Sequence, residues 1–177
     1  PCAHFTRFYA HPAYADFNLR EYGLVYTFPE YNEAWIYPNG NYILGKTILK
    51  VVDPMTGRAE FSDANAQFTV DQVGRINKHD AGVVEDIIES YTNRWRAAFG
   101  KYRYTAPGEW GDKDPLEELF DDPKYGIDPK YATMTVGEIA TDLFESPEVQ
   151  TFYMRAMQTS NGLFPCDQPG LYYHIHA

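Results

Sequence analysis

The spacing of apolar residues changes near residue 62, and this change constrains the fold more than any other feature. Before it, short apolar runs flank two turn-forming stretches, residues 38–41 and 53–57. The first contains Asn39-Gly40, a pair that favours a hairpin because both residues tolerate positive φ. After residue 62, apolar residues recur at the spacing of amphipathic helices. Strands first and helices later predict an α+β domain, with a small, mainly antiparallel sheet packed by about five helices.

The longest helical pattern is expected to begin at Asp80, a residue type that caps helix N-termini. Its apolar residues recur from Val84 to Phe99, and Gly100 is a typical stop. Other helix starts are predicted where a cap residue precedes an apolar stripe, at residues 62–63, 114–115, 135–138 and 146–147. Strands are predicted at residues 23–28, 34–37, 42–44, 47–52 and 58–61.

Length and composition favour a single domain over residues 1–177. The chain is 44% hydrophobic and 16% aromatic, which is enough for a core and also suits a pocket for a large apolar ligand. The net charge of -10 disfavours nucleic acids and anionic lipid surfaces as partners. No run of about 18 apolar residues is present, so no transmembrane segment is expected. Cys2 and Cys166 are expected to be free thiols in a reducing compartment, with pairing as the alternative.

Motifs that would make this sequence an enzyme on its own are absent. It has no GxGxxG dinucleotide fingerprint, no GxxxxGK[ST] phosphate loop and no GxSxG nucleophile elbow. Residues 174–176 (His-Ile-His) would present two metal ligands on one face of a strand, but no other histidine lies near them, so no metal is expected. The acidic pairs at 117–118 and 121–122 are expected to be solvated rather than catalytic.

Three segments together carry a more specific pattern. The first is residues 20–24 (REYGL), followed by Pro29 and the Asn39-Gly40 turn. The second is residues 77–81 (NKHDA), which lead into the longest helix. The third runs from residue 135 to the end and contains the sequences FESP, GLFP and PGLY. In this order, the segments resemble the phytoene-desaturase-like family of FAD-dependent oxidoreductases, which has the carotenoid desaturase/amine-oxidase fold.

The resemblance implies that the chain is the inserted substrate-binding domain of a larger flavoprotein. The substrate implied is apolar, such as an isoprenoid or carotenoid. FAD is implied in the parent protein, whereas this segment alone is expected to bind none because it lacks the glycine fingerprint. The implied partners are the FAD-binding domain of the same protein, or a partner chain, and the apolar substrate. The implied location is the cytoplasm, with peripheral membrane contact left open. Both chain ends look like cuts within a larger protein and are expected to lie close together.

The resemblance also places the site, because in the family the segment corresponding to residues 157–176 leads into an FAD motif. Residues expected to contact the substrate are Met157, Phe164, Tyr172 and Tyr173. His174 and His176 are the candidates for holding or relaying a proton. The alternative is that this segment is ordinary interface core. The alternative function for the whole chain is a redox-free module that binds an apolar ligand or another protein.

Overall fold

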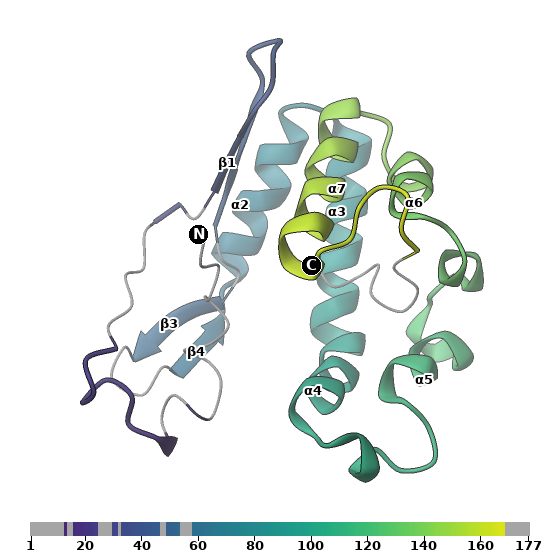
Figure 1. Ribbon diagram of the computed structural model, residues 1–177. Helices are drawn as coiled ribbons and strands as arrows, with labels where there is room; N and C mark the ends of the chain where they lie inside the picture. The colour runs from purple at the N-terminus through teal and green to yellow at the C-terminus, as the bar shows by residue number, and fades with distance from the viewer. Residues whose placement is uncertain are drawn as a thin grey trace. The chain divides into compact units, whose positions relative to one another are not determined.

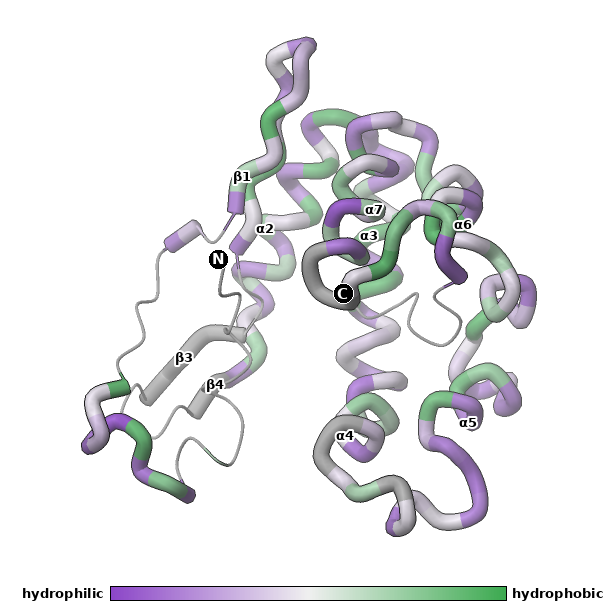
Figure 2. Tube along the Cα trace, in the orientation of Figure 1, coloured by the Kyte–Doolittle hydropathy of each residue, from purple (hydrophilic) through white to green (hydrophobic). Residues whose placement is uncertain are grey.

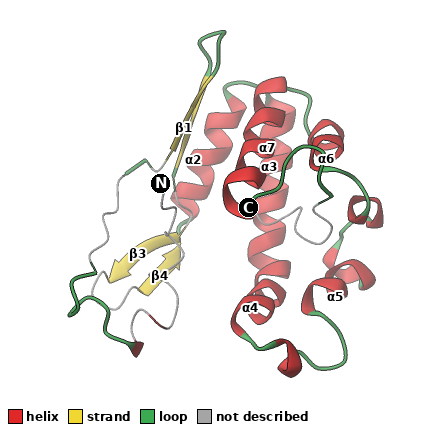
Figure 3. Cartoon of the chain, in the orientation of Figure 1, coloured by secondary structure: helices red, strands yellow, loops and turns green. Residues whose placement is uncertain are grey.

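The computed structural model describes residues 13, 16–24, 30–31, 33–46, 49–53 and 58–168 (Figure 1). Within them, two antiparallel hairpins precede all the long helices (Figure 3), which confirms the α+β class. The helices number about five, as expected, when one continuous helix with a π-helical interruption is counted once. The contacts group into two compact units, Pro1–Gln72 and Val73–Ala177.

The first unit contains both hairpins. Strands β1 (Glu33–Ile36) and β2 (Tyr42–Gly45) pair in antiparallel register, as do β3 (Leu49–Asp53) and β4 (Arg58–Phe61). Among the described residues, they form two separate two-stranded sheets rather than the one small sheet expected. The turn sequences fix the register within each hairpin, but nothing in the pattern fixes pairing between hairpins.

The Asn39-Gly40 turn connects β1 and β2 as predicted. Gly40 has a φ of 87°, a conformation that glycine adopts without strain. The backbone N–H of Asn41 donates to Oδ1 of Asn39 at 3.0 Å. Ile43 of β2 is fully buried, and the N–H of Leu44 donates to the side-chain oxygen of Gln72 on α2 (Asp63–Gly74). A hydrogen bond to the Gln72 side chain therefore links the β1–β2 hairpin to α2.

The second unit is helical. Helix α3 (Lys78–Ser90) continues through the π-helical segment η2 (Tyr91–Trp95) into α4 (Arg96–Tyr104), and α5 (Pro115–Asp121) packs on α4. Helices α6 (Val136–Leu143) and α7 (Pro147–Asn161) pack on each other. Three short 3₁₀ segments lie between α4 and α6: η3 (Pro107–Glu109), η4 (Pro123–Tyr125) and η5 (Pro129–Ala132).

Apolar and polar residues alternate along α3, α6 and α7 (Figure 2), as expected for helices with one packed face. One buried cluster joins η2, α4 and α5 and consists of Trp95, Phe99, Leu116 and Leu119. The buried hydrophobic residues of α6, α7 and the link between them are Val136, Ile139, Ala140, Phe144, Val149, Tyr153 and Met157.

Most predicted helix signals are confirmed. Asp114 caps α5, Thr135 forms a capping box with Glu138 at α6, and Ser146 caps α7. Helix α7 ends at the left-handed Gly162, next to the predicted Asn161-Gly162 stop.

Two predictions about the longest helix are wrong. Its cap is Asn77 rather than Asp80, because the Asn77 side chain accepts from the first free N–H groups of α3. Its predicted stop at Gly100 lies inside α4, which continues to Tyr104. The strand predicted at 23–28 lies mostly outside the described residues, as do both chain ends, whose proximity stays a prediction.

The two glycines near predicted helix ends are expected to respond oppositely to alanine. Gly100 is helical and a Cβ there would meet nothing within 4 Å, so Gly100→Ala should stabilise the chain by about 0.5–1 kcal/mol. Gly162 has a φ of 69°, so Gly162→Ala should destabilise it by about 1 kcal/mol. Urea denaturation of both variants checks this, and destabilisation by Gly100→Ala would contradict the continuous helix.

Candidate functional site

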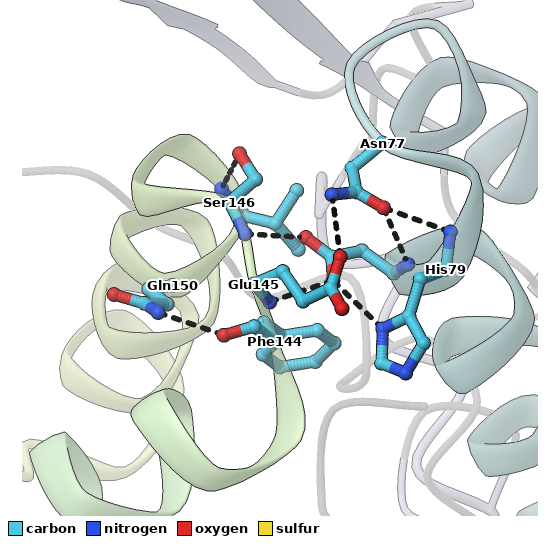
Figure 4. Close-up of polar contacts among 8 residues, drawn as sticks. Asn77, His79, Phe144, Glu145, Ser146 and Gln150 are labelled. Atoms are coloured by element: carbon cyan, nitrogen blue, oxygen red, sulfur yellow. Dashed lines mark hydrogen bonds and ion pairs between the residues drawn. The ribbon is translucent and has the colours of Figure 1, made fainter.

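The most distinctive polar feature of the second unit is the carboxylate of Asp80, whose residue is 0% exposed. It accepts hydrogen bonds from the backbone N–H of Glu145 at 2.8 Å and of Ser146 at 2.9 Å (Figure 4). A buried ionised carboxylate is costly unless it is hydrogen-bonded or paired. Asp80 therefore acts as a polar joint between the first turn of α3 and the α6–α7 link.

Both sides of this joint are set by local sequence. Asn77 caps α3 by accepting from the N–H groups of His79 and Asp80, at 2.8 and 3.1 Å. This cap places Asp80 in the first helical turn, where the helix dipole favours negative charge. On the other side, α6 ends before Phe144 and α7 begins at Pro147, so the N–H groups of residues 145 and 146 lie outside both helices. Asp80 supplies the acceptor that these N–H groups need.

Two exposed side chains surround the buried carboxylate. Nδ1 of His79 lies 3.3 Å from Oδ1 of Asp80, and the other ring nitrogen points away from the joint (Figure 4). Nδ2 of Asn77 donates to Oε2 of Glu145 at 3.2 Å. One possible ligand atom from each of His79, Asp80 and Glu145 lies within 4.8 Å of the others. These three residue types are the ones that hold divalent metals or transfer protons.

Sequence reasoning missed this arrangement. Residues 77–81 indicate only a helix start, and the bond from Glu145 to Asp80 spans 65 residues. Neither spacing nor composition signals a contact over that distance. The local signals at the two ends, the helix start and the Phe144–Pro147 junction, were both recognised.

A second polar cluster joins η5 to α6. Asp142 accepts from the hydroxyl of Tyr131 at 2.7 Å and pairs with Nζ of Lys130 at 2.8 Å. The hydrogen bond from Lys130, followed by that from Tyr131, holds the pKa of Asp142 below its usual range. Burial raises the pKa of Tyr131 well above its usual range, and Asp142 adds to the shift. In this cluster, which we call the Asp142 clasp, the carboxylate of Asp142 is matched by the ammonium group of Lys130 and the hydroxyl of Tyr131.

The turn after α7 is fastened to the N-terminus of α6. The N–H groups of Val136 and Gly137 donate to the carbonyls of Asp167 and Pro165, both at 2.9 Å. A side chain at Gly137 would approach the Pro165 carbonyl to 3.1 Å, so glycine permits this close contact. The turn holds Phe164 with 53% of its surface exposed.

The residues predicted to bind substrate or relay a proton differ in their exposure and in whether the structure describes them. Met157 is fully buried in α7, whereas Phe164 is exposed. Tyr172, Tyr173, His174 and His176 lie outside the described residues. Substrate binding by these residues stays a prediction.

The other predicted polar features have ordinary surroundings. Asp121 pairs with Lys113, and both Glu118 and Asp122 lie near Lys124, so these carboxylates are matched by lysines at the surface. Cys166 is a free, exposed thiol, while Cys2 lies outside the described residues.

No family model, curated protein or solved structure matches this chain. In the part of the chain that is described, no helix has both the length and the apolar character needed to cross a bilayer.

The buried joint is expected to be important for stability. Asp80→Asn should lower the free energy of unfolding by about 1.5–3 kcal/mol, because a neutral amide accepts more weakly and turns an NH₂ group toward N–H donors. Asp121→Asn, which removes an exposed carboxylate, should cost less than about 1 kcal/mol. Urea denaturation at neutral pH compares them, and equal losses would show that the joint adds nothing special.

The Asp142 clasp is expected to make stability depend on pH. A carboxyl with a lowered folded-state pKa contributes stability above its unfolded pKa of about 3.9 and loses it as the pH falls through the folded value. The wild type should therefore lose stability on acidification below about pH 5 more steeply than Asp142→Asn. Urea midpoints measured across this range test the difference, and parallel curves would contradict the pKa shift.

Proposed function

We propose that this chain is the substrate-covering domain of an FAD-dependent oxidoreductase that acts on an apolar, isoprenoid-like substrate. The proposal starts from the resemblance to the phytoene-desaturase-like family. The observation that carries it further is the Asp80 joint. It bonds the second segment of that resemblance, residues 77–81, directly to the third, through the N–H groups of Glu145 and Ser146. Two separate sequence likenesses thus belong to one local structure.

The described residues do not fit the pyrophosphate of FAD. Such a site needs free N–H groups at a helix N-terminus, usually after a glycine-rich turn. The N-termini of four described helices are instead capped by side chains of this chain, namely Asn77, Asp114, Thr135 and Ser146. In the proposal, the flavin is held by an FAD-binding domain of the same protein, into which this domain is inserted, or by a partner chain.

The role left to this domain is to bind and cover the substrate. An apolar substrate is held by apolar and aromatic side chains that exclude water from the reacting centre. Phe164 fits this role because its exposed ring is carried on a turn fastened to α6. Tyr172 and Tyr173 are the proposed amphipathic contacts, and His174 or His176 holds or relays a proton. A cytoplasmic enzyme in peripheral contact with a membrane would meet such substrates.

A second candidate is the redox-free module that binds an apolar ligand or a protein. It is favoured by the β1–β2 hairpin of the first unit, where Ile36 and Tyr42 face each other across the strands. Ile36 is 80% exposed and Tyr42 is 44% exposed. Apolar side chains gathered at a surface often mark an interaction site.

The two candidates separate when the complete product of the encoding gene is purified, together with any chain that co-purifies. The proposal expects bound flavin and oxidation of a C–C bond in an apolar polyene, whereas this chain alone should leave the fluorescence of added FAD unchanged. In the complete protein, Phe164→Ala should raise the KM for the polyene roughly tenfold with kcat unchanged, because an apolar contact is lost in both ground and transition states.

Ile36→Ala is the matched control, since it removes an exposed apolar side chain from the other unit. It should leave KM unchanged. His176→Ala should instead lower kcat while flavin content and Tm stay at wild-type values. A complete protein that binds the polyene but carries no flavin would favour the redox-free module, and one that binds neither would rule out the oxidoreductase.

A further inference from the structure

The charges around Asp80 are unbalanced within the described residues. Asp80 is fully buried, and the carboxylate of Glu145 lies beside it. No described lysine or arginine forms an ion pair with either one, and the only ion-pair partner found for Asp80 is His79. Six other ion pairs were located with both partners within the described residues, and each of these six uses a lysine. Two adjacent carboxylates, one of them buried, favour a nearby positive charge.

We propose that His79, Asp80 and Glu145 bind a divalent transition-metal ion, with Zn²⁺ as the best match. An imidazole nitrogen with carboxylate oxygens is a ligand set that Zn²⁺ accepts, and three protein ligands leave one position for water. The ion would neutralise the pair of carboxylates and link the first turn of α3 to the α6–α7 junction. This inference does not depend on the proposed oxidoreductase function.

The distances suit such an ion with little movement. Two ligands about 2.1 Å from a tetrahedral Zn²⁺ stand roughly 3.4 Å apart. Nδ1 of His79 and Oδ1 of Asp80 are already 3.3 Å apart. The ligand atoms of all three residues lie within 4.8 Å of one another, so the carboxylate of Glu145 has to approach by a further ångström or so. Glu145 and His79 are both exposed, so the surrounding solvent leaves room for this adjustment.

The groups behind the ligands also favour metal binding. Metal ligands are usually oriented by hydrogen bonds from a second layer of groups. The N–H groups of Glu145 and Ser146 fix the Asp80 carboxylate. Nδ2 of Asn77 holds one oxygen of Glu145, which leaves the other for the ion. When Nδ1 of His79 binds a metal, the ring proton lies on the outer nitrogen, which leaves the Nδ1 lone pair for the ion.

The test is a titration of the metal-free chain with Co²⁺, followed by the visible absorption of the bound ion. We expect one Co²⁺ per chain, displaced by one equivalent of Zn²⁺, and a Tm that rises with Zn²⁺. Absence of a saturable cobalt spectrum at neutral pH overturns the proposal.

Three variants locate the ion. Glu145→Gln keeps an oxygen that can accept from Asn77 but removes the charge, and His79→Ala removes the imidazole. Each should weaken Co²⁺ binding at least tenfold, while the Tm measured in EDTA stays close to wild type. The third variant, His174→Ala combined with His176→Ala, removes the other histidine pair that suits a metal and should bind as the wild type does. If the double variant loses the cobalt spectrum while Glu145→Gln and His79→Ala retain it, the ion lies at the histidine pair and the proposal is wrong.

Discussion

The second unit depends on a charge that is hidden from water. The Asp80 carboxylate has no solvent contact, and two backbone N–H groups on the α6–α7 link replace the water it has lost. Hydrogen bonds to a charged group contribute about 1.5–3 kcal/mol each, but removal of the acceptor also leaves buried donors unsatisfied. The interaction is therefore directional as well as strong. It fixes where the α6–α7 junction meets α3, which apolar packing alone specifies less sharply.

The link between α6 and α7 explains why such an acceptor is needed. α6 ends at Leu143 and α7 begins at Pro147, so only three residues connect the two helices. Phe144 is extended, and its carbonyl accepts from the side chain of Gln150, while Ser146 caps the helix that follows. Two N–H groups remain without a helical partner. A side chain from another helix has to satisfy them, and Asp80 is the one that does.

The sequence was most informative where structure is decided locally. Three such features were predicted, and each depends on a few adjacent residues: the Asn39-Gly40 turn, the capping box of Thr135 with Glu138, and the left-handed stop at Gly162.

The predictions for both ends of the longest helix were wrong for a physical reason. Asn77 and Asp80 are both good caps, and only the structure shows that Asp80 is used in a long-range bond. Gly100 is tolerated inside a helix that is anchored just before it by the buried Trp95 and Phe99. The polar cluster at Asp80 was beyond reach because its members come from segments 65 residues apart.

Both proposals for this chain start from groups whose surroundings are incomplete. A buried charge favours a nearby opposite charge, and an exposed apolar side chain favours an apolar surface that covers it. The Asp80 carboxylate accepts hydrogen bonds, but among the described residues its negative charge has no lysine or arginine beside it, and the proposed metal ion supplies a cation.

The turn that carries Phe164 presents a different case. Its backbone carbonyls accept from the N–H groups at the N-terminus of α6, while the aromatic ring of Phe164 is exposed to water. A rigid turn that exposes a large ring loses little entropy when an apolar surface covers the ring. Since the same bonds occupy the N-terminus of α6, that end of the helix has no N–H groups to offer an anion such as the pyrophosphate of FAD. The turn is consequently suited to an apolar partner and unsuited to an anionic one, as the proposed role of a substrate cover requires.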